Sequence, residues 1–209
     1  MNQIQKFLDN TQPNVEYYSL VTGAAIIALF GILVDSIAVL IAAMIVAPLI
    51  EPIIAAAYGF VSWQPAYMLR AGKTFGLSLL AVLIVTAVGL VIFHSVSIPL
   101  EDRTFISFVP QPVAALAIAV VGGVFATLGI FSRRIDSIVV GVGIAVSLMP
   151  PLVASGIGIV AGLGSLVQRG AIIFGLNVLG IFVGSACMFF LMKHNIFNFR
   201  HYMEERRAD

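Results

Sequence analysis

The sequence predicts an all-α membrane protein: a polytopic bundle of six transmembrane helices that forms two inverted three-helix repeats. Three observations predict this fold. Of the 209 residues, 60% are hydrophobic and only 10% are charged, whereas soluble domains carry about a quarter charged residues. Six apolar segments approach the roughly 20 residues that a helix needs to cross a bilayer. Short sequences in the first three segments also recur in the last three.

The charged residues divide the chain into its predicted parts. The six apolar segments lie at about 18–34, 36–61, 74–94, 113–131, 137–163 and 170–192. We expect a cytoplasmic N-terminal segment (1–17), a first three-helix repeat (18–94), an extracytoplasmic linker (95–112), a second repeat (113–192) and a cytoplasmic tail (193–209). Residues 1–17 contain no apolar signal-peptide core, so the first segment is expected to be an uncleaved anchor.

The lysines and arginines predict the orientation, because cytoplasmic loops of membrane proteins carry an excess of both. With six crossings and both termini cytoplasmic, nine of the eleven basic residues lie inside and only Arg103 and Arg169 lie outside. If the second and fifth segments were re-entrant hairpins instead, the division would be six to five. The bias therefore favours six crossings.

The two halves of the chain share markers in the same order. The sequence "DSIAV" at 35–39 returns as "DSIVV" at 136–140, and "FGLSLL" at 75–80 returns as "FGLNVL" at 174–179. Because each half has an odd number of crossings, the second copy must enter the membrane from the opposite side. Inverted repeats of this kind occur in secondary transporters. The alternative is a duplication that gave a stable bundle without transport.

Prolines interrupt the second and fifth segments at comparable places. Pro48 and Pro52 predict two helical pieces, 36–47 and 52–61, with a break between them. Pro150 and Pro151 are adjacent and predict a wider break, because the residue before a proline is disfavoured in helical geometry. Backbone groups freed at membrane depth must face protein or water. The breaks therefore predict a binding site, unless each proline only kinks a packed helix.

Glu51 lies between the two prolines of the first break. A carboxyl group deep in a membrane costs about 2.5–3.5 kcal/mol on insertion scales and marks proton relays or ion sites. It therefore predicts a proton-coupled carrier or a cation site. A neutral acid bonded to a freed carbonyl, or a side chain that reaches the inner interface, would explain it equally well. Glu51 aligns near Val153, so any ionisable site is asymmetric.

Further polar residues lie in the same regions. Ser147 precedes the Pro-Pro pair, and Ser78 and Asn177 occupy equivalent places on the third and sixth segments. They are candidate ligands, although such residues also bridge membrane helices. Asp35 and Asp136 are each followed by serine and read as helix N-caps or as gate carboxylates on opposite faces.

The glycines predict how the helices pack, and the sequence contains no motif for catalysis or cofactor binding. Two GxxxG motifs, Gly158/Gly162 and Gly180/Gly184, predict close helix packing within the bundle or between subunits of a homo-oligomer. The sequence has no catalytic, nucleotide-binding or metal-binding motif, and its formal net charge is +1. Nothing predicts an enzyme, a cofactor, a metal site or nucleic-acid binding.

The run "AAMIVAPLIEPI" at 42–53 resembles the prokaryotic membrane family known as domain of unknown function 389, whose core motif it matches at Met44, Ala47, Pro48, Pro52 and Ile53. The sequence "VSLMPPL" at 146–152 resembles the second proline signature of that family. The likeness covers about residues 15–192. It implies a multi-pass protein of the prokaryotic inner membrane and implies no activity.

We therefore expect a secondary transporter of a small solute or ion, with a central site between the broken helices. An oligomeric ion channel lined by the same breaks is the alternative, and a scaffold that packs against another membrane protein without transport is a third. The charge of the solute is open, because helix N-termini at the breaks favour an anion and Glu51 favours a cation.

Overall fold

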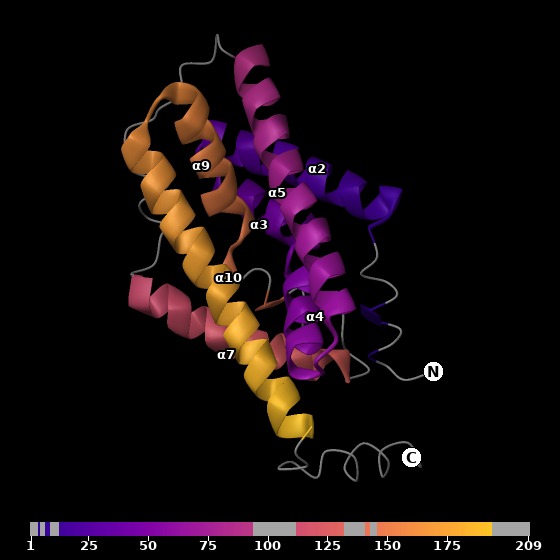
Figure 1. Ribbon diagram of the computed structural model, residues 1–209. Helices are drawn as coiled ribbons and strands as arrows, with labels where there is room; N and C mark the ends of the chain where they lie inside the picture. The colour runs from indigo at the N-terminus through magenta and orange to yellow at the C-terminus, as the bar shows by residue number, and fades with distance from the viewer. Residues whose placement is uncertain are drawn as a thin grey trace, which may run out of the picture.

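The computed structural model describes residues 4, 7, 8, 13–93, 112–131, 141–142 and 146–193. Within these residues the chain forms seven helices and no strand, which confirms the all-α class. The helices are α2 (Val15–Leu33), α3 (Ile37–Val46), α4 (Ile50–Val61), α5 (Pro65–Ile92), α7 (Pro112–Ile130), α9 (Met149–Ala161) and α10 (Gly164–Lys193) (Figure 1).

Length and hydropathy make the chain a multi-pass membrane protein. The helices α2, α5, α7 and α10 are each long and apolar enough to cross a bilayer. A fifth candidate span consists of α3 and α4 together, which are bent by 46° at a short break. Of the predicted fifth segment, the described helix is α9, whose 13 residues are too few to cross alone. The structure therefore supports four or five spans among the described residues.

Two long helices begin earlier than the hydropathy predicts. Helix α5 starts at Pro65, nine residues before the predicted boundary, and α10 starts at Gly164, six residues before it. Hydropathy locates only the apolar part of a span, whereas the helix continues through Arg70 and Arg169 into the polar region. A proline at the first helical position is the local signal for the true start of α5.

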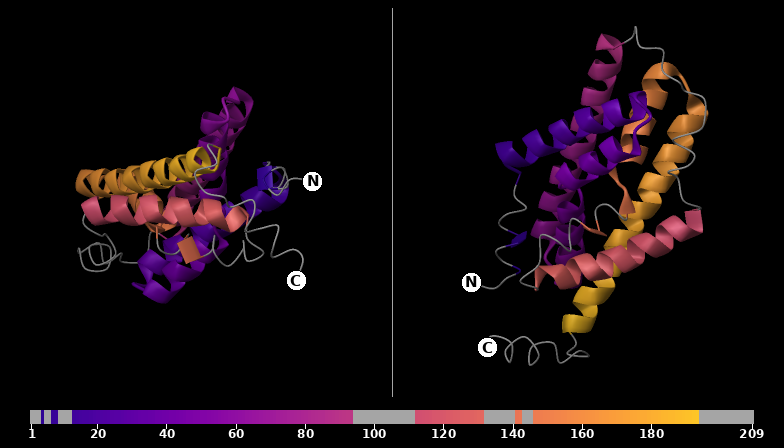
Figure 2. Two further views of the ribbon diagram at one scale, coloured as in Figure 1. Left: turned by 90° about the horizontal axis from the view of Figure 1, so that it is seen from below. Right: turned by 180° about the vertical axis from the view of Figure 1, so that it is seen from behind.

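The short helices α4 and α9 both pack against the long helices α5 and α10. Helix α2 also packs on α5, while α7 lies alongside α10 (Figure 2). The turn that joins α4 to α5 and the turn that joins α9 to α10 lie at opposite ends of the molecule (Figure 1).

These two turns have the same backbone structure. In the first, the Gln64 amide donates to the Gly59 carbonyl at 2.9 Å; in the second, the Leu163 amide donates to the Gly158 carbonyl at 2.8 Å. The backbone is left-handed at Trp63 (φ 56°) and at Gly162 (φ 71°). Each pair of corresponding residues is 99 positions apart in the sequence, as 63 and 162 show.

The contact between α7 and α10 depends on glycines. A Cβ atom at Gly184 would collide with the Val120 carbonyl, and one at Gly180 would collide with Ala119. The Ser185 hydroxyl donates to the Gly123 carbonyl across the same contact, at 3.1 Å. The close approach predicted for Gly180 and Gly184 is therefore confirmed, and it occurs within one chain.

We expect Gly184→Ala to destabilise the protein by about 1–3 kcal/mol, because the added methyl group forces α7 and α10 apart. Gly175→Ala is the matched control on the same helix, since a Cβ atom there meets open space. Unfolding of the purified protein in mixed micelles measures both changes. Equal stabilities of the two variants would contradict this account of the interface.

Candidate functional site

The first helix break lies at residues 47–49, between α3 and α4. Ala47 leaves helical geometry, with φ −75° and ψ 116°, as expected for a residue that precedes a proline. The predicted interruption at Pro48 is thus confirmed. Helix α4 starts at Ile50 rather than at residue 52, so Pro52 is its third residue instead of its first.

The second break lies at Ser147 and Leu148, directly before α9. Ser147 has a left-handed backbone, with φ 53°, which is uncommon for any residue other than glycine. Helix α9 begins at Met149, so Pro150 and Pro151 are its second and third residues. The described part of this break therefore agrees with the predicted Pro-Pro interruption.

The positions of the prolines have a direct physical reason. The first N–H groups of a helix have no partner within that helix. Pro52 in α4, and Pro150 and Pro151 in α9, lack an N–H and fall in this first turn. The prolines thus remove donors that would otherwise need partners deep inside the molecule.

The Pro-Pro pair also leaves two backbone carbonyls without their usual amide donors, and the side chain of Asn177 supplies donors in their place. In a continuous helix the amides of residues 150 and 151 would donate to the carbonyls of Val146 and Ser147. The side-chain nitrogen of Asn177 donates to both of these carbonyls, to that of Ser147 at 3.3 Å. Asn177 is only 2% exposed, and its amide has two N–H donors. It therefore ties α10 to the second break.

Ser78, the counterpart of Asn177 in the sequence, makes different contacts. It is fully buried and donates its hydroxyl proton to the Thr74 carbonyl of its own helix, at 2.8 Å. Its oxygen lies 3.0 Å from the hydroxyl oxygen of Tyr17. Because the single proton of Ser78 is already used, Tyr17 is the donor in this second hydrogen bond.

Tyr17 is a site residue that the sequence did not reveal. A tyrosine at the start of an apolar segment resembles an ordinary interfacial aromatic residue, yet this side chain is only 4% exposed. No local signal distinguishes the two cases, because its partner Ser78 lies 61 residues further along the chain.

Glu51 joins this part of the site from α4. It is the second residue of that helix, where the helix dipole favours a negative charge. Its carboxyl group interacts electrostatically with the Tyr17 side chain. The side chain of Glu51 is half-buried. The start of α2 and the middle of α5 thus meet at Tyr17 and Ser78, and the charge of Glu51 acts on this pair from the first turn of α4.

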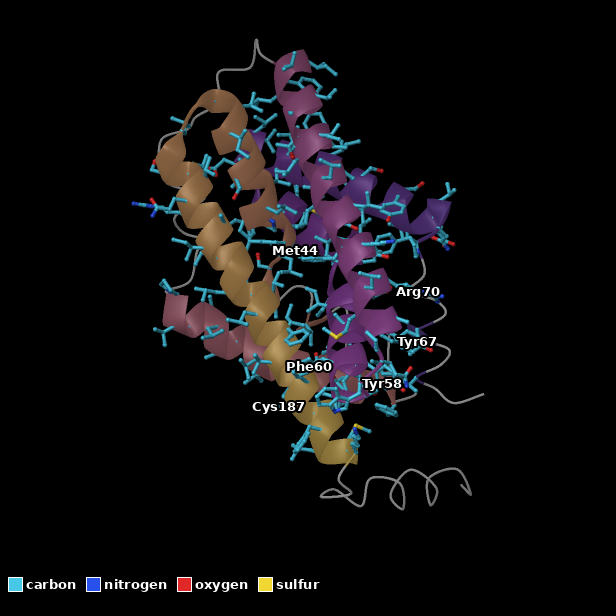
Figure 3. All side chains as sticks on the ribbon, in the orientation of Figure 1. Met44, Tyr58, Phe60, Tyr67, Arg70 and Cys187 are labelled. Carbon is cyan, nitrogen blue, oxygen red and sulfur yellow. The ribbon has the colours of Figure 1, made fainter. Side chains whose placement is uncertain are left out.

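The residues that follow each break are buried in the protein, whereas Ala47, Pro48 and Ser147 in the breaks themselves are half-buried. Leu49 and Met149 are each 1% exposed, and the three first-turn prolines are buried. Met44, the residue one helical turn before Pro48, lies near the centre of the molecule (Figure 3). On this side each break faces protein, as irregular backbone at membrane depth requires.

The predicted helix cap requires a correction. The N-cap of α3 is Ser36, whose hydroxyl accepts from the Val39 amide at 3.5 Å. Asp35 is the exposed residue before it and has a left-handed backbone, with φ 54°. A serine hydroxyl at this position reaches the first turn, so Asp35 is not the cap. Asp136 lies outside the described residues.

A surface pocket lies at the beginning of α2. Residues of one short stretch form it, and its lining consists of Pro13, Asn14, Val15, Tyr18, Ser19 and Thr22. The hydroxyl of Tyr18 is buried and has no hydrogen-bond partner. None of the residues predicted for the central site contributes to this pocket.

Comparison with known proteins places the chain in a family. The family described as "Domain of unknown function (DUF389)" matches residues 44–183, and the chain belongs to it. The chain is also 32% identical over 166 residues to an uncharacterized protein of Methanocaldococcus jannaschii. That alignment covers 79% of this chain and 51% of the relative, so the chain spans about half the length of the relative. No solved structure matches.

We expect Asn177→Leu to destabilise the protein by about 1–3 kcal/mol, because the carbonyls of Val146 and Ser147 lose their donor. Replacing Pro150 and Pro151 by alanine restores two backbone N–H groups, so Asn177→Leu should cost less in that background. A double-mutant cycle on unfolding free energy measures this coupling.

Thr86→Val is the control for this cycle. Its buried hydroxyl donates to the Val82 carbonyl of the same helix. Its cost should be the same with and without the two prolines. If the cost of Asn177→Leu were also unchanged, the replacement of backbone donors by Asn177 would be refuted.

Proposed function

We propose that this member of the DUF389 family carries a small solute or ion across the prokaryotic cell membrane by alternating access. The solute would bind between the break at Pro48 and the break at Pro150. The observation that carries the proposal is that α3 and α4 meet at a bent break and α9 begins at a second one, with Leu49, Met149 and the prolines of both first turns buried. Secondary transporters form their midplane sites from discontinuous helices in this way.

An inverted repeat is part of the proposal, and the packing of the helices supports it. Exchange of the halves would convert α2, α4 and α5 into α7, α9 and α10. If α4 packs against α10, the symmetry then requires that α9 packs against α5. If α2 packs against α5, it requires that α7 packs against α10. All four contacts are present. The matching turns, 99 residues apart, add independent support.

A stacked aromatic pair supports the same symmetry. The rings of Phe75 and Phe174 are stacked with centroids 6.0 Å apart and an angle of 6° between the planes. They are the first residues of the repeated sequences "FGLSLL" and "FGLNVL". Two equivalent residues that touch each other must lie next to the axis that relates them. The proposed pseudo-twofold axis therefore passes between α5 and α10, near these rings.

The separation of 99 residues also revises the alignment of the two breaks. It pairs Pro52 with Pro151 and Glu51 with Pro150, rather than with Val153. Helices α4 and α9 begin at Ile50 and Met149, again 99 positions apart. The proposed site thus has one proline in equivalent positions of both halves and an acid in only one of them.

Transport would require the halves to move, because the breaks are packed in this conformation. Leu49 and Leu148, which directly precede α4 and α9, are both buried. The non-helical residues Ala47 and Ser147 are suitable hinges, since a few residues at helix ends absorb the dihedral changes of such motions.

Flux measurements in proteoliposomes test the proposal. We expect the protein to accelerate the movement of at least one of four probes: ²²Na⁺, ⁸⁶Rb⁺, ³⁶Cl⁻ or protons detected by a trapped pyranine dye. A carrier should give saturable counterflow, whereas the channel alternative should give single-channel steps in planar bilayers. Flux no faster than in protein-free vesicles for all four probes would contradict transport and favour the scaffold.

The proposed orientation places the two matching turns on opposite sides of the membrane, with both termini in the cytoplasm. In a Cys187→Ser background, Gln64→Cys should therefore be cytoplasmic and Ser165→Cys extracytoplasmic, and both positions are exposed. A membrane-impermeant maleimide added to intact cells should label Ser165→Cys alone. After permeabilisation it should label both, which controls for reactivity. Labelling of both in intact cells would refute the inverted arrangement.

A further inference from the structure

We infer that the turn between α4 and α5 is anchored in the headgroup region of the bilayer, and that the side chain of Trp63 makes this contact with phospholipid. The inference does not depend on the proposed transport, because it concerns how the molecule is held in its membrane. It starts from an exposed aromatic residue in a backbone conformation that such residues seldom adopt.

Trp63 stands at a position where helices usually end with glycine. Its amide donates to the Phe60 carbonyl at 3.3 Å, and the next amide, that of Gln64, donates to the Gly59 carbonyl. This is the Schellman motif, whose left-handed residue is most often glycine. The residue 99 positions later is Gly162, whereas Trp63 places a Cβ atom on a backbone with φ 56°. The first turn therefore carries a backbone strain that the second turn avoids.

The side chain of Trp63 points away from the protein. It is 87% exposed, the highest value among the large hydrophobic residues that the structure describes. Packing against the rest of the molecule thus offsets little of the backbone strain. Tryptophan is enriched where a membrane meets water, because its ring is apolar and its indole N–H is a hydrogen-bond donor. Phospholipid offers both an apolar edge and acceptor oxygens at that level.

Lys193 indicates the level of the turn relative to the bilayer. It lies in the last turn of α10, where the apolar segment of this candidate span ends. Its ammonium group donates to the Val61 carbonyl at 2.9 Å, two residues before Trp63. A lysine at the end of a spanning helix places its charge at the interface. The turn between α4 and α5 therefore lies at a membrane boundary.

Two tyrosines flank the turn and support the same level. Tyr58 lies in the last turn of α4 and Tyr67 in the first turn of α5, with ring centroids 5.9 Å apart in an edge-on contact. Both are half-buried, and they lie toward the same end of the molecule (Figure 3). Tyrosine and tryptophan together form the aromatic belts of membrane proteins.

Exposed residues beside the turn fit the two parts of a phospholipid. Phe60 and Leu69 are 55% and 66% exposed and suit acyl chains. Gln64, at the turn itself, is exposed and polar, and Arg70 and Lys73 on α5 are also exposed. Side chains of a helix tilt toward its N-terminus, so these two charges lie closer to the turn than their backbone does. Their sign favours the phosphate groups of anionic lipid.

Fluorescence quenching in vesicles tests the contact, because Trp63 is the only tryptophan in the chain. The wild-type protein is placed in vesicles of phosphatidylcholine and phosphatidylglycerol whose acyl chains carry bromine either next to the headgroup or near the chain end. We expect bromine next to the headgroup to reduce the emission about twofold or more, and bromine near the chain end to quench less. Iodide in the water should quench Trp63 less than it quenches a free tryptophan amide.

Ile84→Trp in a Trp63→Phe background is the matched control. Ile84 is 54% exposed and lies near the middle of the apolar part of α5. A tryptophan at this position should show the reverse order, with stronger quenching by bromine near the chain end.

Two further variants test the backbone strain without the ring. Trp63→Gly should unfold at a higher temperature than Trp63→Ala in the same vesicles, because only alanine keeps a Cβ atom at φ 56°. Equal unfolding temperatures would show that the left-handed backbone carries no strain.

The quenching results decide which surroundings Trp63 has. Strong quenching by iodide and none by bromine would put the turn in water and overturn the inference. Emission that neither agent quenches would put Trp63 against protein, such as a second copy of the chain, and would overturn it as well. Stronger quenching by bromine near the chain end would put the ring among acyl chains rather than headgroups. None of these outcomes depends on whether the protein moves a solute.

Discussion

Every backbone amide and carbonyl inside a bilayer must find its hydrogen-bond partner within the protein, because lipid offers none. This constraint governs the centre of the molecule. Pro150 and Pro151 remove two donors at the start of α9, and the Asn177 amide on α10 supplies two in return. One side chain thus allows a left-handed residue, Ser147, and two prolines to exist in the interior. The contact of this break with α10 follows from the same exchange of donors.

The first half meets the same constraint differently, because its prolines are spaced rather than adjacent. Pro48 and Pro52 are four residues apart, so only one of them falls within the first turn of α4. The position that corresponds to Asn177 in the sequence repeat is Ser78, a single-donor residue that bonds to its own helix and to Tyr17. Similar backbone geometry therefore coexists with different chemistry, and the half that lacks the amide contains the carboxylate of Glu51.

The sequence predicts features that a few neighbouring residues determine. Proline removes an N–H wherever it stands, so the interruptions at Pro48 and Pro150 could be located without coordinates. The contacts of Asn177 and Tyr17 could not, because their partners lie 30 to 61 residues away and apolar sequence carries no signal for such distant pairs. Hydropathy also misplaced the start of α5, since a helix does not end where its apolar residues end. The sequence alone left the pairing of Glu51 open by a few residues, because its repeated markers are separated by 99 residues at Phe75 and Phe174 and by 101 at Asp35 and Asp136.

A bundle that merely fills the membrane has no need of these breaks. A continuous helix satisfies its own backbone, whereas the observed arrangement requires a buried amide, a left-handed serine and a half-buried acid. Each of these is unfavourable by itself in an apolar interior. With alanine at positions 150 and 151, backbone amides could satisfy the carbonyls of Val146 and Ser147 within a helix, and position 177 would need no amide. A chain that keeps all of them, in two halves that touch through Phe75 and Phe174, accepts a cost that packing does not require, and the binding of a solute at the breaks, as we propose, would account for that cost.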